Sequence, residues 1–184
     1  MRQPFLKKED IVYLHGISGE ELPDKYLDWI NDRDVTQYLE KCYFPVTAED
    51  VRKHIKDCND GNNLLLAIVL AQDDRYIGNI RLGPIYWIQR QADINILIGD
   101  HDYRRKDDHT VQVAIELVLE YAFMRLGLVK VSVSIIEDDT ESIHLYEKLG
   151  FRKEAILRRH TFLDGVFHNV FLYGLLDENF NNHL

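Results

Sequence analysis

Hydrophobic positions recur at helical spacing most clearly in residues 107–126. Apolar side chains there follow the i, i+3, i+4, i+7 repeat of an amphipathic helix, at Val111, Ala114, Ile115, Val118, Leu119, Ala122 and Phe123. Gly127 follows, and glycine often ends a helix. Shorter helices are predicted at residues 20–32, continued by 35–39, and at 47–58 and 140–149. Thr47 and Asp50 form a capping box at the start of the 47–58 helix.

Segments rich in β-branched and aromatic residues predict strands between these helices. They span residues 5–16, 63–71, 75–87, 92–98, 128–136, 151–162 and 166–175. The last two are joined by Asp164-Gly165, a strong signal for a tight hairpin. The order of elements predicts an α/β (α+β) fold, with helices around a mixed and mostly antiparallel sheet. No repeat or linker divides the chain, so residues 1–184 are predicted to form a single domain.

The composition is that of a globular protein with an acidic surface. Asp and Glu number 31 against 22 Lys and Arg, which gives a net charge of −9. This balance argues against nucleic-acid partners and against an anionic membrane surface, because both require a basic footprint. The longest apolar run, residues 64–71, is far shorter than the ~20 residues of a membrane helix. Cys42 and Cys58 lack CxxC spacing, so we expect two reduced thiols and a cytoplasmic location.

The sequence lacks the motifs of several common enzyme classes. HExxH and paired Cys/His spacing are absent, so no metal site is predicted. The hydrolase motif GxSxG, the phosphate loop GxxxxGK[ST] and the dinucleotide motif GxGxxG are absent as well.

Three stretches resemble the GCN5-related N-acetyltransferase (GNAT) superfamily, in particular its ribosomal-protein and sugar-amine acetyltransferase branch. The sequence SIHLYEKLGF at 142–151 is similar to the family signature of a Ser, an apolar pair, a Tyr and a terminal Gly-Phe. Residues 77–80 with 92–99 resemble its central hairpin and fourth strand, and residues 29–39 resemble its opening segment. The likeness covers nearly the whole chain.

This resemblance implies an acetyl-CoA site at the point where the fourth and fifth strands, 92–98 and 128–136, splay apart. Unpaired backbone groups there would bind the pantetheine arm, at Leu97, Ile98 and Gly99. The pyrophosphate would lie at the start of the long helix, where free N–H groups favour anions. The residues implied for it are Arg104, Arg105, Lys106, His109 and Thr110. Asp139 stands where many relatives hold the pantetheine arm with an Asn, and its alternative role is to cap the next helix.

The loop before the long helix departs from the family pattern. Arg105, Asp107 and His109 occupy positions that are usually glycine, and the carboxylate of Asp107 would repel a pyrophosphate. Three interpretations follow. The chain transfers acetyl groups from acetyl-CoA, with cationic side chains replacing the glycine cradle; it is a degenerate fold that acts as a binding or scaffold module; or it uses an acyl donor without a pyrophosphate.

Acetyl transfer needs a neutral amine and an acid for the leaving thiolate. Tyr146 takes the acid role by resemblance, and its alternative is core packing. Ser142 is expected to bond the backbone of the first helical turn. No residue stands out as the general base, and a water chain is an alternative; the candidates are His101, His109, His144, Glu137 and Asp93.

Aromatic residues of the N-terminal helices and of the 75–98 hairpin predict the acceptor pocket, although at least half of them have core packing as the alternative. They are Trp29, Tyr38, Tyr43, Phe44, Tyr86 and Trp87. The predicted acceptor is a primary amine on a small molecule, an amino sugar or a protein N-terminus. Resemblance alone makes a homodimer the expected assembly.

Overall fold

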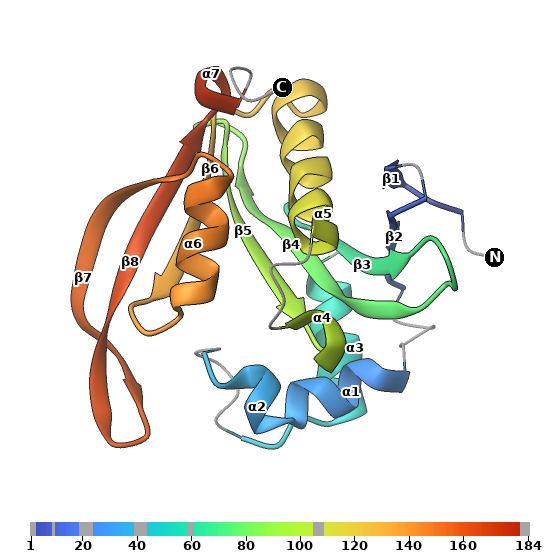
Figure 1. The fold of residues 1–184 in the computed structure, drawn as a ribbon, viewed down its shortest axis with the longest axis horizontal. Helices are drawn as coiled ribbons and strands as arrows, with labels where there is room; N and C mark the ends of the chain where they lie inside the picture. Colours follow the sequence, from blue (N-terminus) through green and yellow to red (C-terminus); the bar gives the residue numbers. More distant parts are fainter. Residues whose placement is uncertain are drawn as a thin grey trace.

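A computed structural model describes residues 3–8, 10–18, 24–38, 44–58, 61–104 and 109–180 (Figure 1). Eight described strands form one sheet in the order β1-β2-β3-β4-β5-β6-β8-β7. Their bounds are β1 Leu6–Lys8, β2 Val12–Gly16, β3 Leu64–Leu70, β4 Tyr76–Tyr86, β5 Gln91–Ile98, β6 Lys130–Ile136, β7 Arg152–Leu163 and β8 Val166–Leu176. The mixed and mostly antiparallel sheet predicted from the sequence is confirmed.

The helices lie on both faces of the sheet and at one end of it. They are α1 Asp24–Asn31, α2 Arg33–Thr36, α3 Ala48–Cys58, α4 His101–Arg104, α5 His109–Glu120, α6 Thr140–Lys148 and α7 Asp177–Phe180. A π-helical turn, η1 Tyr121–Arg125, continues α5. In Figure 1, α1, α2 and α4 gather where β5 ends, and the β7–β8 hairpin forms the edge of the sheet opposite β1. None of the described helices is long and apolar enough to cross a membrane.

The two faces of β3 show how the core is divided. Leu66 and Ile68 face the large core cluster, which includes buried side chains of α5 and α6. Leu65 and Ala67 point the other way, into a second cluster with residues of α1 and α3. This alternation is that of a strand buried on both faces, and it places β3 to β5 between two layers of helix.

One pair of strands breaks the antiparallel pattern and shapes the functional end of the molecule. β5 and β6 run parallel, and their pairing covers only Gln91↔Lys130 to Asp93↔Ser132. β5 continues to Ile98 and β6 to Ile136 without further pairing between them. The strands therefore splay apart toward their carboxyl ends, as the resemblance implied.

Two local structures that the sequence predicted, a capping box and a tight hairpin turn, are present in the fold. At the start of α3 the Asp50 N–H donates to Thr47 Oγ1 at 3.2 Å, and the Thr47 N–H donates to Asp50 Oδ2 at 2.9 Å. This is the predicted capping box. In the β7–β8 turn, Asp164 and Gly165 adopt φ of 47° and 86°, the positive values that the tight hairpin requires.

Two N-terminal predictions were wrong in detail. The single strand expected at 5–16 is the hairpin of β1 and β2, because the chain turns back between Lys8 and Val12, with Ile11 N–H donating to Lys8 O at 3.1 Å. The helix at 20–32 does not run on into 35–39. Asp32 ends α1 and caps α2, accepting from Asp34 N at 2.8 Å. Residues 19–23 and 39–43 lie outside the described part.

Candidate active site

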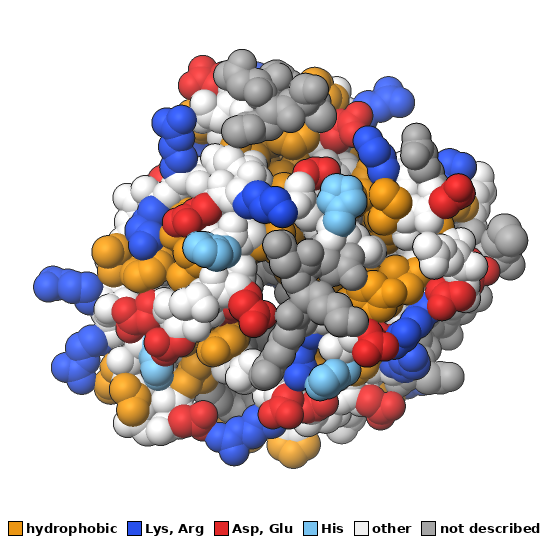
Figure 2. Space-filling view, in the orientation of Figure 1, with side chains coloured by type: hydrophobic (Ala, Val, Ile, Leu, Met, Phe, Trp, Pro, Cys, Tyr) orange, Lys and Arg blue, Asp and Glu red, His pale blue; other side chains and the backbone are white. Residues whose placement is uncertain are grey.

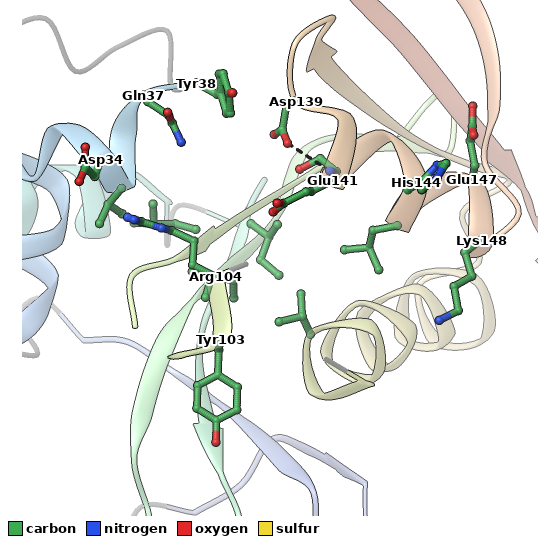
Figure 3. Close-up of a pocket in the computed structure, with 17 residues that line it drawn as sticks. Asp34, Gln37, Tyr38, Tyr103, Arg104, Asp139, Glu141, His144, Glu147 and Lys148 are labelled. Carbon is green, nitrogen blue, oxygen red and sulfur yellow. Dashed lines mark hydrogen bonds between the residues drawn. The ribbon is translucent and has the colours of Figure 1, made fainter. Parts of the chain in front are cut away.

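A cleft of about 760 Å³ opens at the splayed end of β5. Its walls come from β5, α2, α4, the first turn of α5 and one face of α6. Figure 3 shows α2 and α6 on opposite sides of the cleft, with Arg104 of α4 between them. Over this side of the molecule, acidic and basic side chains are intermingled (Figure 2). The cleft is large enough for an extended small molecule.

The backbone of β5 turns polar groups toward the cleft. Gly99 N–H donates to Ile77 O at 3.1 Å, so this pair is a hydrogen-bonded one in the β4–β5 ladder. Hydrogen-bonded pairs alternate along an antiparallel ladder, so the next is Asn79↔Leu97. The backbone groups of Ile96 and Ile98 therefore point away from β4, to the side that β6 has left. They are positioned to bind an extended chain in the splay, such as a pantetheine arm.

Arg104 brings a cation to the same cleft. It lies at the end of α4 and lines the cleft, and its Nε is buried without a hydrogen-bond partner in the described structure. A buried donor without a partner is costly, which makes an anionic ligand an effective partner for it. Of the other residues implied for the pyrophosphate, Thr110 is buried in the first turn of α5 and His109 is exposed beside it. Arg105, Lys106, Asp107 and Asp108 lie outside the described residues.

Tyr146 lies on α6, and its side chain is buried in the core. The residue is 2% exposed, packs edge-to-face on Phe151 with ring centroids 5.1 Å apart, and has no hydrogen-bond partner for its hydroxyl in the described structure. Burial raises the pKa of this phenol, and the charge of Asp139 raises it further. The hydroxyl therefore stays protonated as a donor. The Tyr146 side chain is not part of the cleft wall, but its neighbour Leu145 is.

Asp139 takes the capping role that the sequence left open. Its side chain accepts from Ser142 N at 3.1 Å at the start of α6, and both residues line the cleft. The preceding loop is held by Glu137, which accepts from the backbone and side chain of Asn169 at 2.7 and 2.8 Å. These hydrogen bonds lower the pKa of Glu137. Its carboxylate is engaged in structure, which argues against a role as base.

Of the five candidate bases, His144 alone lines the cleft. His101 and His109 are exposed on α4 and at the start of α5. Asp93 is half-buried on β5 at the point where the splay begins. Burial raises the pKa of Asp93, and the nearby charge of Arg81 partly offsets this shift.

Acidic residues that the sequence interpretation passed over line the cleft, together with the cationic residues Arg104 and Lys148. Asp34 lies on α2, Glu141 and Glu147 lie on α6, and all three are exposed cleft-lining residues. Figure 3 shows Asp34 and Glu141 on facing sides. Glu141 comes one residue before the family signature, so its place in the sequence could have marked it as a site residue. Asp34 could not be found in this way, because only the fold brings it to the other side of the cleft from Glu141. The exposed carboxylates of Asp34 and Glu141 suit a ligand that carries positive charge.

The aromatic residues predicted to line the acceptor pocket lie in different parts of the fold. Tyr38 lines the cleft. Trp29 is buried and stacks on Tyr76 at 4.7 Å, and it fills the space where a side chain of Gly99 would lie. Gly99 thus has a packing role here.

Tyr86 and Trp87 lie at the far end of the β4–β5 hairpin. Tyr86 pairs with Gln91, at the start of β5, whereas the cleft opens at Ile98. Seven residues of strand separate these points, roughly 23 Å. Trp87 Nε1 donates to Asn62 at 3.1 Å. The structure therefore does not bring this pair to the cleft. Phe44 is 82% exposed, and Tyr43 lies outside the described residues.

Comparison with known proteins supports the chemistry suggested by this geometry. The family model described as "Acetyltransferase (GNAT) domain" matches residues 12–152. The spermidine N(1)-acetyltransferase of Escherichia coli K12 is 28% identical over 168 residues, which cover 90% of this chain and 80% of that protein. The enzyme of the same name from Vibrio cholerae serotype O1 is 26% identical over 180 residues, covering 96% and 93%.

The fold has a solved counterpart. The crystal structure of spermidine N-acetyltransferase from Vibrio cholerae in complex with CoA and spermine superposes with a TM-score of 0.81 at 23% identity, covering 93% of this chain and 98% of that one. Because these relatives are named as transferases, the comparison favours acetyl transfer over a binding or scaffold module. The chain therefore belongs to the GNAT acetyltransferase family and is an acetyl-CoA-dependent N-acetyltransferase.

Proposed function

We propose that this enzyme acetylates a primary amino group of a polyamine, a small flexible amine with two or more positive charges. The observation that carries the proposal is the exposed carboxylates of Asp34 on α2 and Glu141 on α6, which line the cleft beside the donor site. The names of the two curated relatives, both spermidine acetyltransferases, support the same substrate class.

Charge explains why such an acceptor suits the site. An amine that is to be acetylated must be neutral, so it gains nothing from a carboxylate at the moment of attack. A second ammonium group on the same molecule keeps its charge and can pair with the carboxylate of Asp34 or of Glu141. A protein N-terminus or a monoamino sugar such as glucosamine offers no second amine at a fixed reach. Tyr38 would pack against the carbon chain of the acceptor.

The donor side uses backbone more than side chains. The backbone groups of Ile96 and Ile98, flanking Leu97, would hold the pantetheine arm. Arg104, which lines the cleft, would bind the phosphates, and His109 and Thr110 at the start of α5 are proposed to lie beside them. Arg105 and Lys106 are proposed to contribute further positive charge. Bound acetyl-CoA would supply the activated acetyl thioester.

Two residues of α6 are assigned to proton transfer. The buried hydroxyl of Tyr146, which has no partner in the described structure, is proposed to donate to the leaving thiolate. His144 lines the cleft and is proposed to take the proton that the amine releases. Asp139 supports both by capping α6. Trp29 supports the end of β5 through its packing on Gly99.

A panel of acceptors tests the substrate class. The purified enzyme is given acetyl-CoA with spermidine, spermine, n-butylamine, glucosamine or a short peptide, and released thiol and acetylated product are measured. We expect kcat/KM for spermidine and spermine to exceed that for n-butylamine at least tenfold, because n-butylamine has the reactive amine without the second charge. Equal rates for spermidine and n-butylamine would contradict the polyamine proposal and leave acetyl transfer intact. A homodimer and a cytoplasmic location stay predictions.

A further inference from the structure

Arg75 forms a bidentate ion pair outside the cleft. It lies immediately before β4, and its Nε and Nη2 donate to the two carboxylate oxygens of Asp100 at 2.8 and 2.7 Å. Nη2 also donates to Asp102 at 3.0 Å. The Asp100 side chain is 5% exposed, whereas that of Arg75 is 36% exposed. A charge-assisted fork of this kind fixes orientation as well as charge.

Asp100 is the junction between β5 and α4. Its N–H, like that of Gly99, donates to Ile77 O at 3.1 Å, which anchors it to the end of the β4–β5 ladder. Its side chain accepts from Asp102 N at 3.1 Å, and its carbonyl accepts from the backbone of Tyr103 and Arg104 at 3.1 Å each. One buried carboxylate thus fixes the direction in which the chain leaves the sheet.

The short helix α4 depends on this junction. A helix of four residues is not stable by itself, because a single turn does not offset its own ordering cost. Arg75 holds both ends of the turn: it binds Asp100 before the helix, and its guanidinium lies over the Tyr103 ring at 5.6 Å from the centroid. Figure 3 shows Tyr103 and Arg104 leaving α4 in opposite directions, with Arg104 toward the cleft. The clamp on Tyr103 therefore also sets the direction of Arg104.

We propose that Arg75 is a positioning residue for the donor: through Asp100 and α4 it holds Arg104 in place to bind the phosphates of acetyl-CoA. Arg75 does not line the cleft, so its effect passes through α4. The inference rests on the donor site of the proposed function. It predicts that the effect of Arg75 is confined to the phosphate-bearing part of the donor.

The test compares two donors, acetyl-CoA and S-acetylpantetheine, which carries the same thioester arm without the nucleotide and pyrophosphate. For Arg75→Ala we expect KM for acetyl-CoA to rise about tenfold, with kcat and the acceptor KM within about twofold of wild type. KM for S-acetylpantetheine should stay within about twofold. Arg75→Lys, which keeps the charge and loses the fork, should lie between wild type and Arg75→Ala. Lys130→Ala, which removes the ion pair with Glu154 away from the cleft, is the matched control and should change neither KM.

A double-mutant cycle with Arg104→Ala separates positioning from general support. If Arg75 acts through Arg104, the Arg75→Ala/Arg104→Ala variant should bind acetyl-CoA no more weakly than Arg104→Ala alone. An unchanged KM for acetyl-CoA in folded Arg75→Ala would overturn the proposal. So would an equal loss for both donors, or fully additive effects in the cycle.

Two further measurements keep the outcome decisive. If Arg75→Ala does not fold, Arg75→Lys and Asp100→Asn take its place, and a wild-type KM for acetyl-CoA in both would overturn the proposal. If wild type acetylates none of the acceptors, the proposed function fails, while calorimetric titration of CoA still tests Arg75. A CoA dissociation constant about tenfold weaker in Arg75→Ala supports its role, and an equal constant overturns it.

Discussion

The two walls of the cleft are built in different ways. The donor wall is mainly backbone: the Ile96 and Ile98 amides where β5 leaves β6, and the first turn of α5. The acceptor wall is mainly side chains, with carboxylates carried by α2 and α6. Backbone geometry follows from the topology of the sheet and tolerates sequence change, whereas a carboxylate is lost by one substitution. A fold of this kind can therefore keep its donor while its acceptor preference changes.

The donor wall should be most sensitive at Gly99, where a methyl group has no space. A Cβ built on Gly99 would lie 1.8 Å from a ring carbon of Trp29. Gly99→Ala should therefore lower the free energy of unfolding by about 3 kcal/mol through overpacking, measured by urea denaturation. Gly16→Ala is the control, because no atom lies within 4 Å of a Cβ built there. Equal stabilities of the two variants would show that the end of β5 is not tightly packed.

Tyr146 separates chemistry from stability on the α6 side. Tyr146→Phe should lower kcat about 100-fold, within the range of a general acid, or about 2.7 kcal/mol in activation free energy. Stability should not fall, because the hydroxyl that is removed makes no hydrogen bond in the described structure.

A second buried tyrosine provides the contrast. Tyr173 donates to Glu147 at 2.9 Å, so Tyr173→Phe should cost about 1 kcal/mol of stability and leave kcat near wild type. Initial-rate assays would measure kcat of both variants, and thermal melts would measure their stability. A fully active Tyr146→Phe would remove its assigned role.

Removing a charge from the acceptor wall should change the KM for the amine and no other kinetic constant. Asp34→Asn and Glu141→Gln each remove an exposed carboxylate, worth up to about 1 kcal/mol, so the KM for spermidine should rise about fivefold in each. The KM for acetyl-CoA should not change. Glu49→Gln, an exposed acid on α3 away from the cleft, is the matched control. A rise in both KM values would mean that the two walls are not independent.

The smallest effect concerns the loop that supports α6. Hydrogen bonds from Asn169 lower the folded-state pKa of Glu137 below its usual 4.5. Its contribution to stability is thus fully present above the unfolded-state pKa and is lost as the pH falls through the folded value. Glu137→Gln should therefore be less stable than wild type at pH 7, with the gap closing below about pH 4. Denaturation across pH 2–7 measures it, and a constant gap would contradict the assignment.

Local signals allowed much of the fold to be predicted. The repeat through residues 107–126, the Thr47 capping box and the Asp164-Gly165 turn each depend on near neighbours in sequence. The splay beyond Asp93 came from resemblance, since strand register is not written in either strand alone. The four-residue helix α4 was missed because a single turn has no periodicity to detect.

The site was harder to predict, because it depends on strand length and on distant elements. Aromatic content placed Tyr86 and Trp87 in the acceptor pocket, but the length of β5 carries them to the opposite end. Asp34 was passed over because only the break at Asp32 turns α2 toward α6. Tyr146 and Arg104 were named from the sequence, but their unpaired buried atoms could be found only in the structure.

The alternating ladder of β5 also gives the strand two kinds of amide proton. Those of Asn95 and Leu97 are protected by β4, whereas those of Ile96 and Ile98 face the splay and should exchange faster with deuterated solvent. When CoA occupies the splay, exchange at Ile96 and Ile98 alone should slow. The coenzyme would then act as the missing neighbour of an incomplete sheet, and every catalytic cycle would include the making and unmaking of that edge.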